Sequence, residues 1–584
     1  MTRATEGDLT TKLQRLFLAS MQRILWTWRL SKFSPHFTGL LIFTFLALIA
    51  GERTHWFGPA WQSEVASGGA GLRGLPARPK LLLIIIIDQF RPDYLVRFHR
   101  DFVERGFNLL LTGANFVNCR YEQAITITGP GHATLLTGAY PETHGIIGNE
   151  WFDRGLGRLV DCVGDPGTRL VDDRGTTAEP GASPHYLVGS TLGDELRASN
   201  NYQSRVVSIS LKDRSAILPG GHTANAAYWY SSTTGQFVTS TYYMPSLPPW
   251  AIQFNSQPPA KAYCGQTWQA LPGTVNAGRQ VLGSFTPTPN EPCPDTRFLT
   301  WLDATPFMSE IELNFAKKAI ESERLGQGGT MDVLTISLSE NDLIGHTFGP
   351  YSPEVADMTL RTDRYLADFF RFVDNAVGLN NVWVALTADH GVAPNPKFIT
   401  EHRLGAGHAR MGEVINAVEA ALSKRFGSDT YVQSATGVVI YFNRGTLDKH
   451  KAKEDEAEAL GASAAAAVPG VQVVFSRHEL SEGLLSQNPL AASVSRSYFG
   501  QRSGDLFLIF EPFAVNVEAE TETVHGTPWT YDSQVPLVLW GSPFESGVYV
   551  SPCHPIDLAP TLAVALGLNL PSDAQGRPLR EAFK

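Results

Sequence analysis

The sequence has few cysteines, and none of them forms a C-x-x-C pair. The five are Cys119, Cys162, Cys264, Cys293 and Cys553. This spacing argues against a zinc cluster held by thiolates. In an oxidising compartment five cysteines allow one or two disulfides and leave at least one free thiol. The pairing does not follow from the sequence.

The chain also lacks a dense block of lysine and arginine in its body. Its 47 basic and 57 acidic residues give a formal net charge of −10. A nucleic acid duplex is usually met by a basic surface, so the composition argues against such a partner and favours small substrates. The 584 residues are enough for one large α/β domain with insertions, or for two or three ordinary domains.

The apolar run near the N-terminus is too short to span a bilayer. "FTGLLIFTFLALIA", residues 37–50, follows several basic residues and falls short of the roughly 20 residues that a spanning helix needs. We therefore expect residues 1–50 to be a signal peptide, with export to the periplasm. Met21 is an alternative start, and a weak cleavage pattern at Ala50 keeps an uncleaved membrane anchor open as the alternative. The Gly/Ala/Pro-rich residues 51–79 are predicted to be a linker.

Apolar runs from residue 80 onward have the pattern of a parallel sheet. "KLLLIIIIDQF", "MDVLTISLSEND", "NVWVALTADHG" and "SQVPLVLWG" are apolar along their whole length, as strands buried on both faces are. Residues 352–377 have helical spacing and connect the second run to the third. The sequence predicts an α/β fold with a central, mostly parallel sheet and helices on both faces, over residues 80–584.

Two regions interrupt this pattern. Residues 151–300 are rich in Gly, Pro, Ser, Thr, Tyr and Trp and contain short β-like runs, which predicts a loop-rich insertion that covers the sheet edge. Residues 400–500 contain "GVVIYF", an Ala-rich helix and "VQVVFS", which predicts a small inserted α+β unit. We expect both regions to be inserted caps on the catalytic domain.

Acidic residues and histidines follow the ends of the predicted strands, where open α/β sheets bind their ligands. Oxygen and imidazole ligands without thiolate suit catalytic zinc. Asp342 and His346 are four residues apart, so a helix would place both on one face. Each residue alone is more often a helix cap or a solvated side chain than a ligand. Their shared edge makes the set a candidate metal site: Asp88, Asp342, His346, Asp389, His390 and His525.

The motifs, taken in order along the chain, resemble those of the alkaline phosphatase superfamily. The resemblance is to its threonine-nucleophile branch, which includes phosphate-irrepressible periplasmic alkaline phosphatases and nucleotide pyrophosphatase/phosphodiesterases. It spans roughly residues 80–565 and rests on "IIIIDQFRPDYL", "TGPGHATLLTGAYPETHGIIGN", "DLIGHTFGP", "ADHGV" and "VHGTPW". The resemblance implies an alkaline-phosphatase-like sandwich and a metal-dependent hydrolase of phosphate esters with two Zn²⁺ ions.

The same resemblance assigns roles to single residues. It makes Thr128 the nucleophile, on a first zinc that is also held by Asp88, Asp389 and His390. It gives the second zinc to Asp342, His346 and His525. The spacing of the motif selects Thr128 over Thr126, the rival hydroxyl. We expect Gly129, Pro130 and Gly131 to form a tight turn ahead of a helix that starts near His132, and Thr128 to become phosphothreonine.

Three polar residues bear on the choice between monoesters and diesters. A monoester carries close to two negative charges and benefits from additional cationic donors. Lys212 and Arg214 resemble the Lys-x-Arg pair of the monoesterases, two residues apart as on one face of a strand, and Asn149 resembles their phosphate-binding asparagine. A solvated charge pair is the plain alternative for Lys212 and Arg214. We therefore predict an exported alkaline phosphatase that acts as a monomer on small phosphate monoesters.

Other functions remain as alternatives to this prediction. The first is a type I phosphodiesterase or nucleotide pyrophosphatase that uses the same metals and nucleophile. A sulfatase would need Cys or Ser at position 128, and the phosphoglycerate mutase branch uses manganese and a serine, so Thr128 argues against both. An inactive, metal-stabilised surface protein is a further alternative. Other histidines (His144, His222, His402 and His408) are expected to be structural or to support the ligands.

Overall fold

The computed structural model describes residues 78–272, 280–287, 293–405, 407–484 and 487–584. The predicted export segment and most of the predicted linker lie outside these residues, and both stay predictions. No helix in the described part of the chain is long and apolar enough to cross a membrane.

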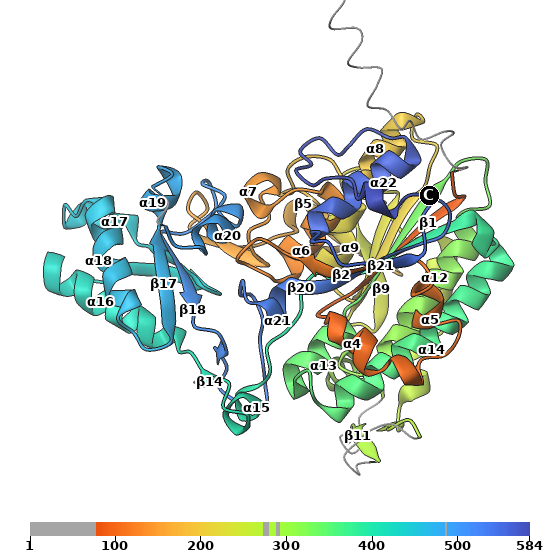
Figure 1. Ribbon diagram of the computed structural model, residues 1–584, viewed down its shortest axis with the longest axis horizontal. Helices are drawn as coiled ribbons and strands as arrows, with labels where there is room; N and C mark the ends of the chain where they lie inside the picture. Colours follow the sequence, from red (N-terminus) through yellow and green to blue (C-terminus); the bar gives the residue numbers. More distant parts are fainter. Residues whose placement is uncertain (1–77, 273–279, 288–292, 406, 485–486) are drawn as a thin grey trace, which may run out of the picture. The chain divides into compact units, whose positions relative to one another are not determined.

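An 11-stranded sheet forms the centre of the described structure (Figure 1). Its core is five parallel strands, each buried along nearly its whole length. Across the sheet these are β13 (Val382–Thr387), β1 (Leu81–Ile87), β12 (Asp332–Leu338), β7 (Val206–Ser210) and β8 (Ala226–Ser231). Continuous Leu, Ile and Val runs form such strands because helices cover both sides and no side chain faces water.

Six further strands complete the sheet at its two edges. Beyond β13 the order is β20 (Gln534–Trp540), β2 (Ala114–Arg120) and β21 (Gly547–Tyr549). Beyond β8 it is β9 (Gln236–Ser240), β5 (Gly164–Asp172) and β6 (Gly175–Ala182). These strands pair antiparallel, except that β21 pairs parallel with β2. The fourth apolar run, β20, pairs antiparallel with both β13 and β2, so our assignment of it to a parallel pattern was wrong. Apolar content reports burial on both faces, but not strand direction.

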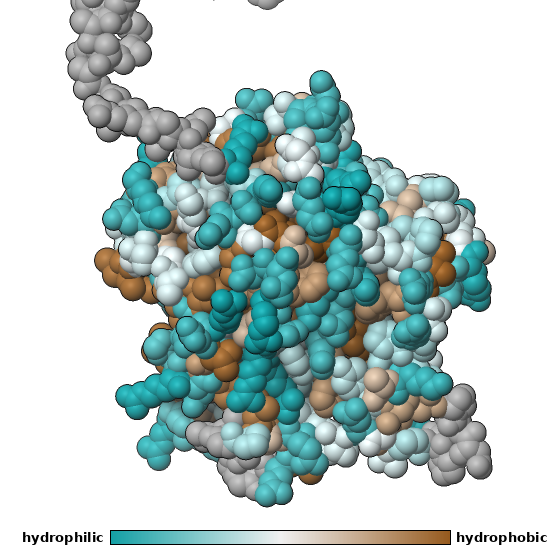
Figure 2. Space-filling model, turned by 90° about the vertical axis from the view of Figure 1, so that its right-hand side faces the viewer, coloured by the Kyte–Doolittle hydropathy of each residue, from teal (hydrophilic) through white to brown (hydrophobic). Residues whose placement is uncertain are grey.

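Helices lie on both sides of the sheet (Figure 1). One side carries α12 (Phe307–Glu323) and α14 (Pro353–Ala376); the other carries α6 (Thr128–Thr137), α9 (Asp213–Gly220) and α22 (Leu558–Leu566). Helix α14 coincides closely with the helix predicted for residues 352–377, and the Ser352 side chain caps its first turn. On the face drawn in Figure 2, hydrophilic side chains are spread widely and divide the apolar residues into small groups.

The region 151–300 differs from the expected loop-rich cover of the sheet. Strands β7 and β8 come from this region and lie in the parallel core, where β7 pairs with β12 and β8 pairs with β7. All five residues of β7 are buried, although Ser208 and Ser210 interrupt its apolar pattern. A disulfide joins Cys264 to Cys293 in the same region.

Residues of the second irregular region form a separate four-stranded sheet. Its order is β15 (Val432–Thr436), β16 (Val439–Phe442), β18 (Leu506–Phe510) and β17 (Val471–Ser476), all antiparallel. Helices α16 (Met411–Phe426) and α18 (Glu454–Ala466), the latter Ala-rich, pack on it around a small core of their own. The turn between β15 and β16 faces the active-site region, as described below.

Candidate two-metal active site

Four neighbouring parallel strands end at the candidate site. Asp88 follows β1, Lys212 follows β7, Asp389 and His390 follow β13, and α13 (Glu340–Phe348) follows β12. Because the strands are parallel, their carboxyl ends meet at one edge of the sheet. The sheet order β13-β1-β12-β7 therefore brings side chains from four distant parts of the sequence together.

The first group of candidate ligands is Asp88, Asp389 and His390, all fully buried. Nε2 of His390 lies 3.3 Å from Oδ1 of Asp88 and 3.3 Å from Oδ2 of Asp389. None of these three atoms makes a hydrogen bond of acceptable geometry within the described structure. Buried polar atoms that converge without partners fit a bound cation, because a protein rarely leaves such atoms unsatisfied.

The second group is Asp342, His346 and His525. Helix α13 places Asp342 and His346 one turn apart, with Nε2 of His346 3.1 Å from Oδ1 of Asp342. His525 comes from the loop before α21 (Thr530–Ser533), and its Nε2 lies 3.2 Å from Nε2 of His346. Two imidazole nitrogens that face each other at this distance need a positive charge between them, so this group also fits a cation.

Each of the three histidines is oriented in the same way. Their Nδ1 atoms lie 2.6–3.0 Å from backbone carbonyl oxygens: Thr523 for His346, Gly391 for His390 and Thr126 for His525. A carbonyl can only accept, so Nδ1 carries the proton and Nε2 keeps its lone pair for the site. This is the usual arrangement of metal-binding histidines.

The charges of the site act strongly on one another. Burial disfavours the charged form of His390, but Asp389 and Asp88 outweigh this and raise its pKa to about 9. Burial lowers the pKa of His525 to about 4, helped by the charge of His390. Burial and the nearby Asp342 act to raise the pKa of Asp88, but Lys212 and His390 hold it below its usual value.

Lys212 lies between the two groups of ligands. Its Nζ donates to Oδ2 of Asp88 at 2.7 Å and to Oδ2 of Asp342 at 2.6 Å. Burial opposes the charge of Lys212, but Asp342 and Asp88 raise its pKa. One ammonium group therefore compensates two carboxylates, one directly after β1 and one in the first turn of α13.

Lys212 and Arg214 do not lie on a strand, which corrects the sequence-based assignment. Lys212 is the N-cap residue of α9, and Arg214 is in its first turn. Nε of Arg214 is buried without a hydrogen-bond partner, and its guanidinium lies 3.8 Å from Asp213. The Lys-x-Arg pair is thus presented at the N-terminus of a helix, which also favours anions.

Thr128 is the first residue of α6 rather than part of a turn ahead of it. The helix starts four residues earlier than the expected start near His132, because Pro130 is well tolerated in the first turn of a helix. Thr128 is 2% exposed, and its hydroxyl makes no hydrogen bond within the described part of the chain. Thr126, the rival hydroxyl, donates to the carbonyl of Thr527 at 2.7 Å and is therefore occupied.

The Gly-Pro-Gly-His motif brings α6 against the end of β13. A Cβ at Gly131 would lie 2.4 Å from the carbonyl oxygen of Asp389, so no other residue fits without movement. Nδ1 of His132 donates to the carbonyl of Thr128 at 2.9 Å and lies 3.1 Å from Oδ2 of Asp389. Asn149 accepts a hydrogen bond of 2.7 Å from the amide of Gly129. The motif therefore connects the candidate nucleophile, a candidate ligand and the candidate phosphate-binding asparagine.

Gln89 is part of the site but was missed in the sequence. Its Nε2 donates to Oδ1 of Asp342 at 2.6 Å, and its backbone amide donates to Oδ1 of Asp389 at 3.2 Å. Its φ of 62° is unusual for a residue other than glycine, and such strain is often found at functional sites. The only signal in the sequence is its place directly after Asp88.

Four further histidines that the sequence analysis considered, His144, His222, His402 and His408, lie apart from these groups. His144 is buried and bonds to Thr134, and burial lowers its pKa to about 3. His222 contacts the carbonyl of Gly189, and His402 stacks on Phe398. His408 lies in the short strand β14 (Gly407–His408). No candidate cluster among the described residues includes any of them.

Comparison with known proteins identifies the family. The family model for type I phosphodiesterase / nucleotide pyrophosphatase matches residues 82–532. The alkaline phosphatase PafA of Elizabethkingia meningoseptica is 34% identical, over 89% of this chain and 97% of that protein. The alkaline phosphatase PhoV of Synechococcus elongatus is 33% identical, over 87% and 94%. The crystal structure of PafA matches with a TM-score of 0.80, covering 87% of this chain and 99% of the other.

These similarities confirm the predicted fold and the predicted class of enzyme, a metal-dependent hydrolase of phosphate esters. The match spans the whole set of strands that carries the candidate ligands. The chain therefore belongs to the type I phosphodiesterase/nucleotide pyrophosphatase family.

Proposed function

We propose that this protein is an exported alkaline phosphatase that hydrolyses small phosphate monoesters through a phosphothreonine at Thr128. The names of its relatives, alkaline phosphatases at 33–34% identity over nearly their whole length, support this activity. The position of Lys212 is the observation that favours monoesters over diesters as substrates. Its ammonium group reaches both groups of candidate ligands, with Arg214 two residues further on.

A phosphate monoester requires more positive charge than a diester does. It has three non-bridging oxygens and nearly two negative charges, whereas a diester has one charge and a second, bulky ester group. Lys212 and Arg214 supply two cations, and Asn149 supplies an amide donor, since its Oδ1 is already bonded to Gly129. A variant of PafA studied by crystallography carries changes at a threonine, an asparagine, a lysine and an arginine, the same four residue types.

The reaction has two steps. The hydroxyl oxygen of Thr128 attacks phosphorus, the bond from phosphorus to the ester oxygen breaks, and the alcohol leaves with a proton. Water then attacks the phosphothreonine, which releases inorganic phosphate and restores the hydroxyl. Thr128 is held at the N-terminus of α6, where backbone amides favour an approaching anion. Asn149, Lys212 and Arg214 bind the phosphate oxygens and keep them oriented through both steps.

We propose two zinc ions as the cofactors. Asp88, Asp389 and His390, with the hydroxyl of Thr128, would hold the first ion, and the second group of ligands (Asp342, His346 and His525) would hold the other. Such ions lower the pKa of a coordinated hydroxyl and stabilise the charge that develops during displacement at phosphorus. The mixture of carboxylate and imidazole ligands without thiolate supports zinc.

The alternative is a phosphodiesterase, which the description of the matching family names. We would compare kcat/KM for 4-nitrophenyl phosphate and methyl 4-nitrophenyl phosphate with the zinc-loaded enzyme. We expect the monoester to be preferred by at least about 100-fold, and Lys212→Ala to lower the monoester rate by about 10²-fold but the diester rate much less. Lys318→Ala, at an exposed position of α12, is the matched control. A strong preference for the diester, with monoester activity unchanged in Lys212→Ala, would overturn the proposal.

A further inference from the structure

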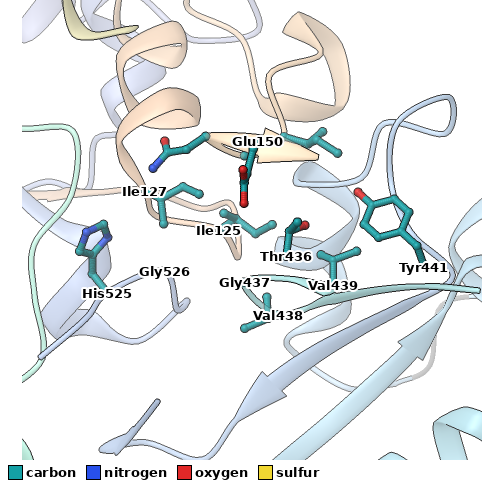
Figure 3. A pocket seen from close by; sticks show the side chains of 13 residues that line it. Ile125, Ile127, Glu150, Thr436, Gly437, Val438, Val439, Tyr441, His525 and Gly526 are labelled. Carbon is teal, nitrogen blue, oxygen red and sulfur yellow. The ribbon is translucent and has the colours of Figure 1, made fainter. Parts of the chain in front are cut away.

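A pocket of ≈ 260 Å³ opens directly beside the proposed phosphate site (Figure 3). It shares Asn149 with that site and His525 with the second group of ligands. A phosphate bound at Thr128 and Asn149 would therefore direct its ester group into this pocket. Apart from Asn149 and His525, the residues that line the pocket have no proposed role in binding phosphate or metal.

Its walls are mostly apolar and come from two parts of the fold. Ile125 and Ile127 line one side, on the segment that leads into α6. Val438 and Val439 line the opposite side, at the turn between β15 and β16 (Figure 3). The inserted α+β unit thus contributes part of the substrate pocket. Such a surface favours an apolar group over a sugar or a second phosphate.

The charged groups of the pocket add a second preference, for a ligand with a positive charge. No lysine or arginine is among the described residues that line it, so a second phosphate group would find no cation there. Glu150, at the start of β3 (Glu150–Asp153), extends into the pocket (Figure 3). Glu150 is exposed, so water reaches its carboxylate, which forms none of the ion pairs found among the described residues. A solvated carboxylate beside an apolar wall adds a negative charge, which favours a cationic ligand over an anionic one.

We propose that this pocket binds the alcohol part of the substrate and selects phosphate monoesters with an apolar body that carries an ammonium group. The ring or branched alkyl body packs between Ile127 and Val438, and the ammonium group pairs with Glu150. This inference rests on the proposed monoesterase function.

The test uses two aryl phosphates that carry opposite charges at the same position, 4-(aminomethyl)phenyl phosphate and 4-(carboxymethyl)phenyl phosphate. A methylene group separates each charge from the ring, so the two phenols are similar leaving groups. We expect kcat/KM of the zinc-loaded enzyme to favour the ammonium ester by at least about tenfold, the size of one ion pair replaced by one repulsion. Glu150→Gln should reduce this preference to within about twofold. Glu179→Gln, an exposed glutamate on β6, should leave it unchanged.

Hydrolysis of the uncharged ester phenyl phosphate tests the proposed monoesterase function independently of the role of the pocket. Failure of the wild-type enzyme to hydrolyse phenyl phosphate would refute the monoesterase itself. Hydrolysis of phenyl phosphate with equal rates on the two charged esters, or a preference that survives in Glu150→Gln, would refute the role of the pocket alone. A preference that disappears in Glu150→Gln but persists in Glu179→Gln supports it.

A second, independent observation concerns Cys119 and Cys553. The two residues are paired in a parallel β-bridge, with backbone hydrogen bonds of 3.0 and 3.1 Å on either side. Both side chains are fully buried, and both residues are free thiols in this structure. Neighbouring residues in such a bridge are close enough for a disulfide. The proposed export would place the chain in an oxidising compartment, where the Cys264–Cys293 disulfide would also form.

We infer that Cys119 and Cys553 form a second disulfide during folding, which attaches the C-terminal segment to the central sheet. The two thiols give up two electrons and two protons to a disulfide of a thiol oxidoreductase, which becomes two thiols. Protein exported to an oxidising compartment would be denatured without reductant and alkylated, then digested for mass spectrometry. One alkylated thiol, Cys162, and a peptide linking Cys119 to Cys553 are expected. Three or more alkylated thiols would overturn the inference.

Discussion

The backbone amide of Gly129 donates a hydrogen bond of 2.7 Å to Oδ1 of Asn149. This bond ties the candidate phosphate-binding residue to the helix that begins with Thr128. It also fixes the orientation of the amide group of Asn149, because Oδ1 accepts and only Nδ2 remains as a donor. The two residues are 20 positions apart in the sequence, and this hydrogen bond joins them directly.

This orientation predicts an order for two substitutions at Asn149. Asn149→Ala removes the donor to phosphate and should lower kcat/KM for 4-nitrophenyl phosphate by about 10–10²-fold. Asn149→Asp keeps the bond to Gly129 but places a negative charge beside a dianionic substrate, so its loss should be larger. Steady-state kinetics at saturating zinc measure both. An aspartate variant more active than the alanine variant would contradict the assigned orientation.

The two threonines of the motif should differ sharply. Thr128→Ala removes the phosphoryl acceptor, and we expect activity to fall by at least about 10³-fold without change in fold. The other three proposed ligands remain to hold the first zinc ion, namely Asp88, Asp389 and His390. Thr126→Ala loses only the hydrogen bond to Thr527 and should stay within about tenfold of wild type. Trapping of a phosphorylated peptide by acid quench would identify the acceptor. A phosphoryl group found on Thr126 would contradict the assignment of Thr128 as the nucleophile.

The parallel core could be predicted because its strands carry their own signal. The runs that become β1, β12 and β13 are apolar throughout, and burial on both faces is the reason. Strand β7 was missed as a core strand since two serines divide it; Oγ of Ser210 donates to the carbonyl of Ser337 at 2.8 Å. That bond depends on a partner far away in the sequence. The direction of β20 could not be read for the same reason, because pairing is a tertiary property.

The candidate ligands were found because strand ends are local features of the sequence. The family resemblance then selected among the acids and histidines that the pattern provides. Gln89 and the turn at Val438 carry no comparable signal, because their roles follow from contacts with Asp342 and with the pocket. Likewise, the close approach of Gly131 to Asp389 joins two distant parts of the sequence and carries no local signal.

Removal of one imidazole should distinguish the two proposed metal sites by the number of zinc ions that remain bound. His525→Ala takes one of three ligands from the second group and leaves the first group intact. We expect the purified variant to hold about one zinc ion per chain instead of two, with kcat/KM for the monoester lower by at least about 10²-fold. Inductively coupled plasma mass spectrometry of dialysed protein measures the stoichiometry. His222→Ala, which changes a histidine outside both groups, should keep two ions. Two ions in His525→Ala would argue against the assigned ligand.

We expect the ionisation of Asp303, which is not among the candidate metal ligands, to make the free energy of unfolding depend on pH. Asp303 lies at the end of α11 (Thr296–Asp303), and its Oδ1 is buried without a hydrogen-bond partner. Burial raises its pKa from 3.8 to about 6, although a hydrogen bond with Ser232 opposes this. The folded protein therefore holds this proton more tightly than the unfolded chain does. Stability is lost as the pH rises from about 4 to about 6, and above pH 6 the full cost, about 3 kcal/mol, applies.

Asp303→Asn is neutral at every pH and should avoid this cost. We expect its free energy of unfolding to exceed that of wild type by about 1–3 kcal/mol at pH 8, and to be nearly equal to it at pH 4. The free energies of unfolding of both proteins would be measured by denaturant titration in excess chelator. Both proteins are then metal-free at both pH values, so loss of metal at low pH does not contribute to the difference. Asp455→Asn, at an exposed position of α18, should give no gain at either pH. A gain at pH 4 as large as that at pH 8 would mean that packing, and not the ionisation of Asp303, is responsible.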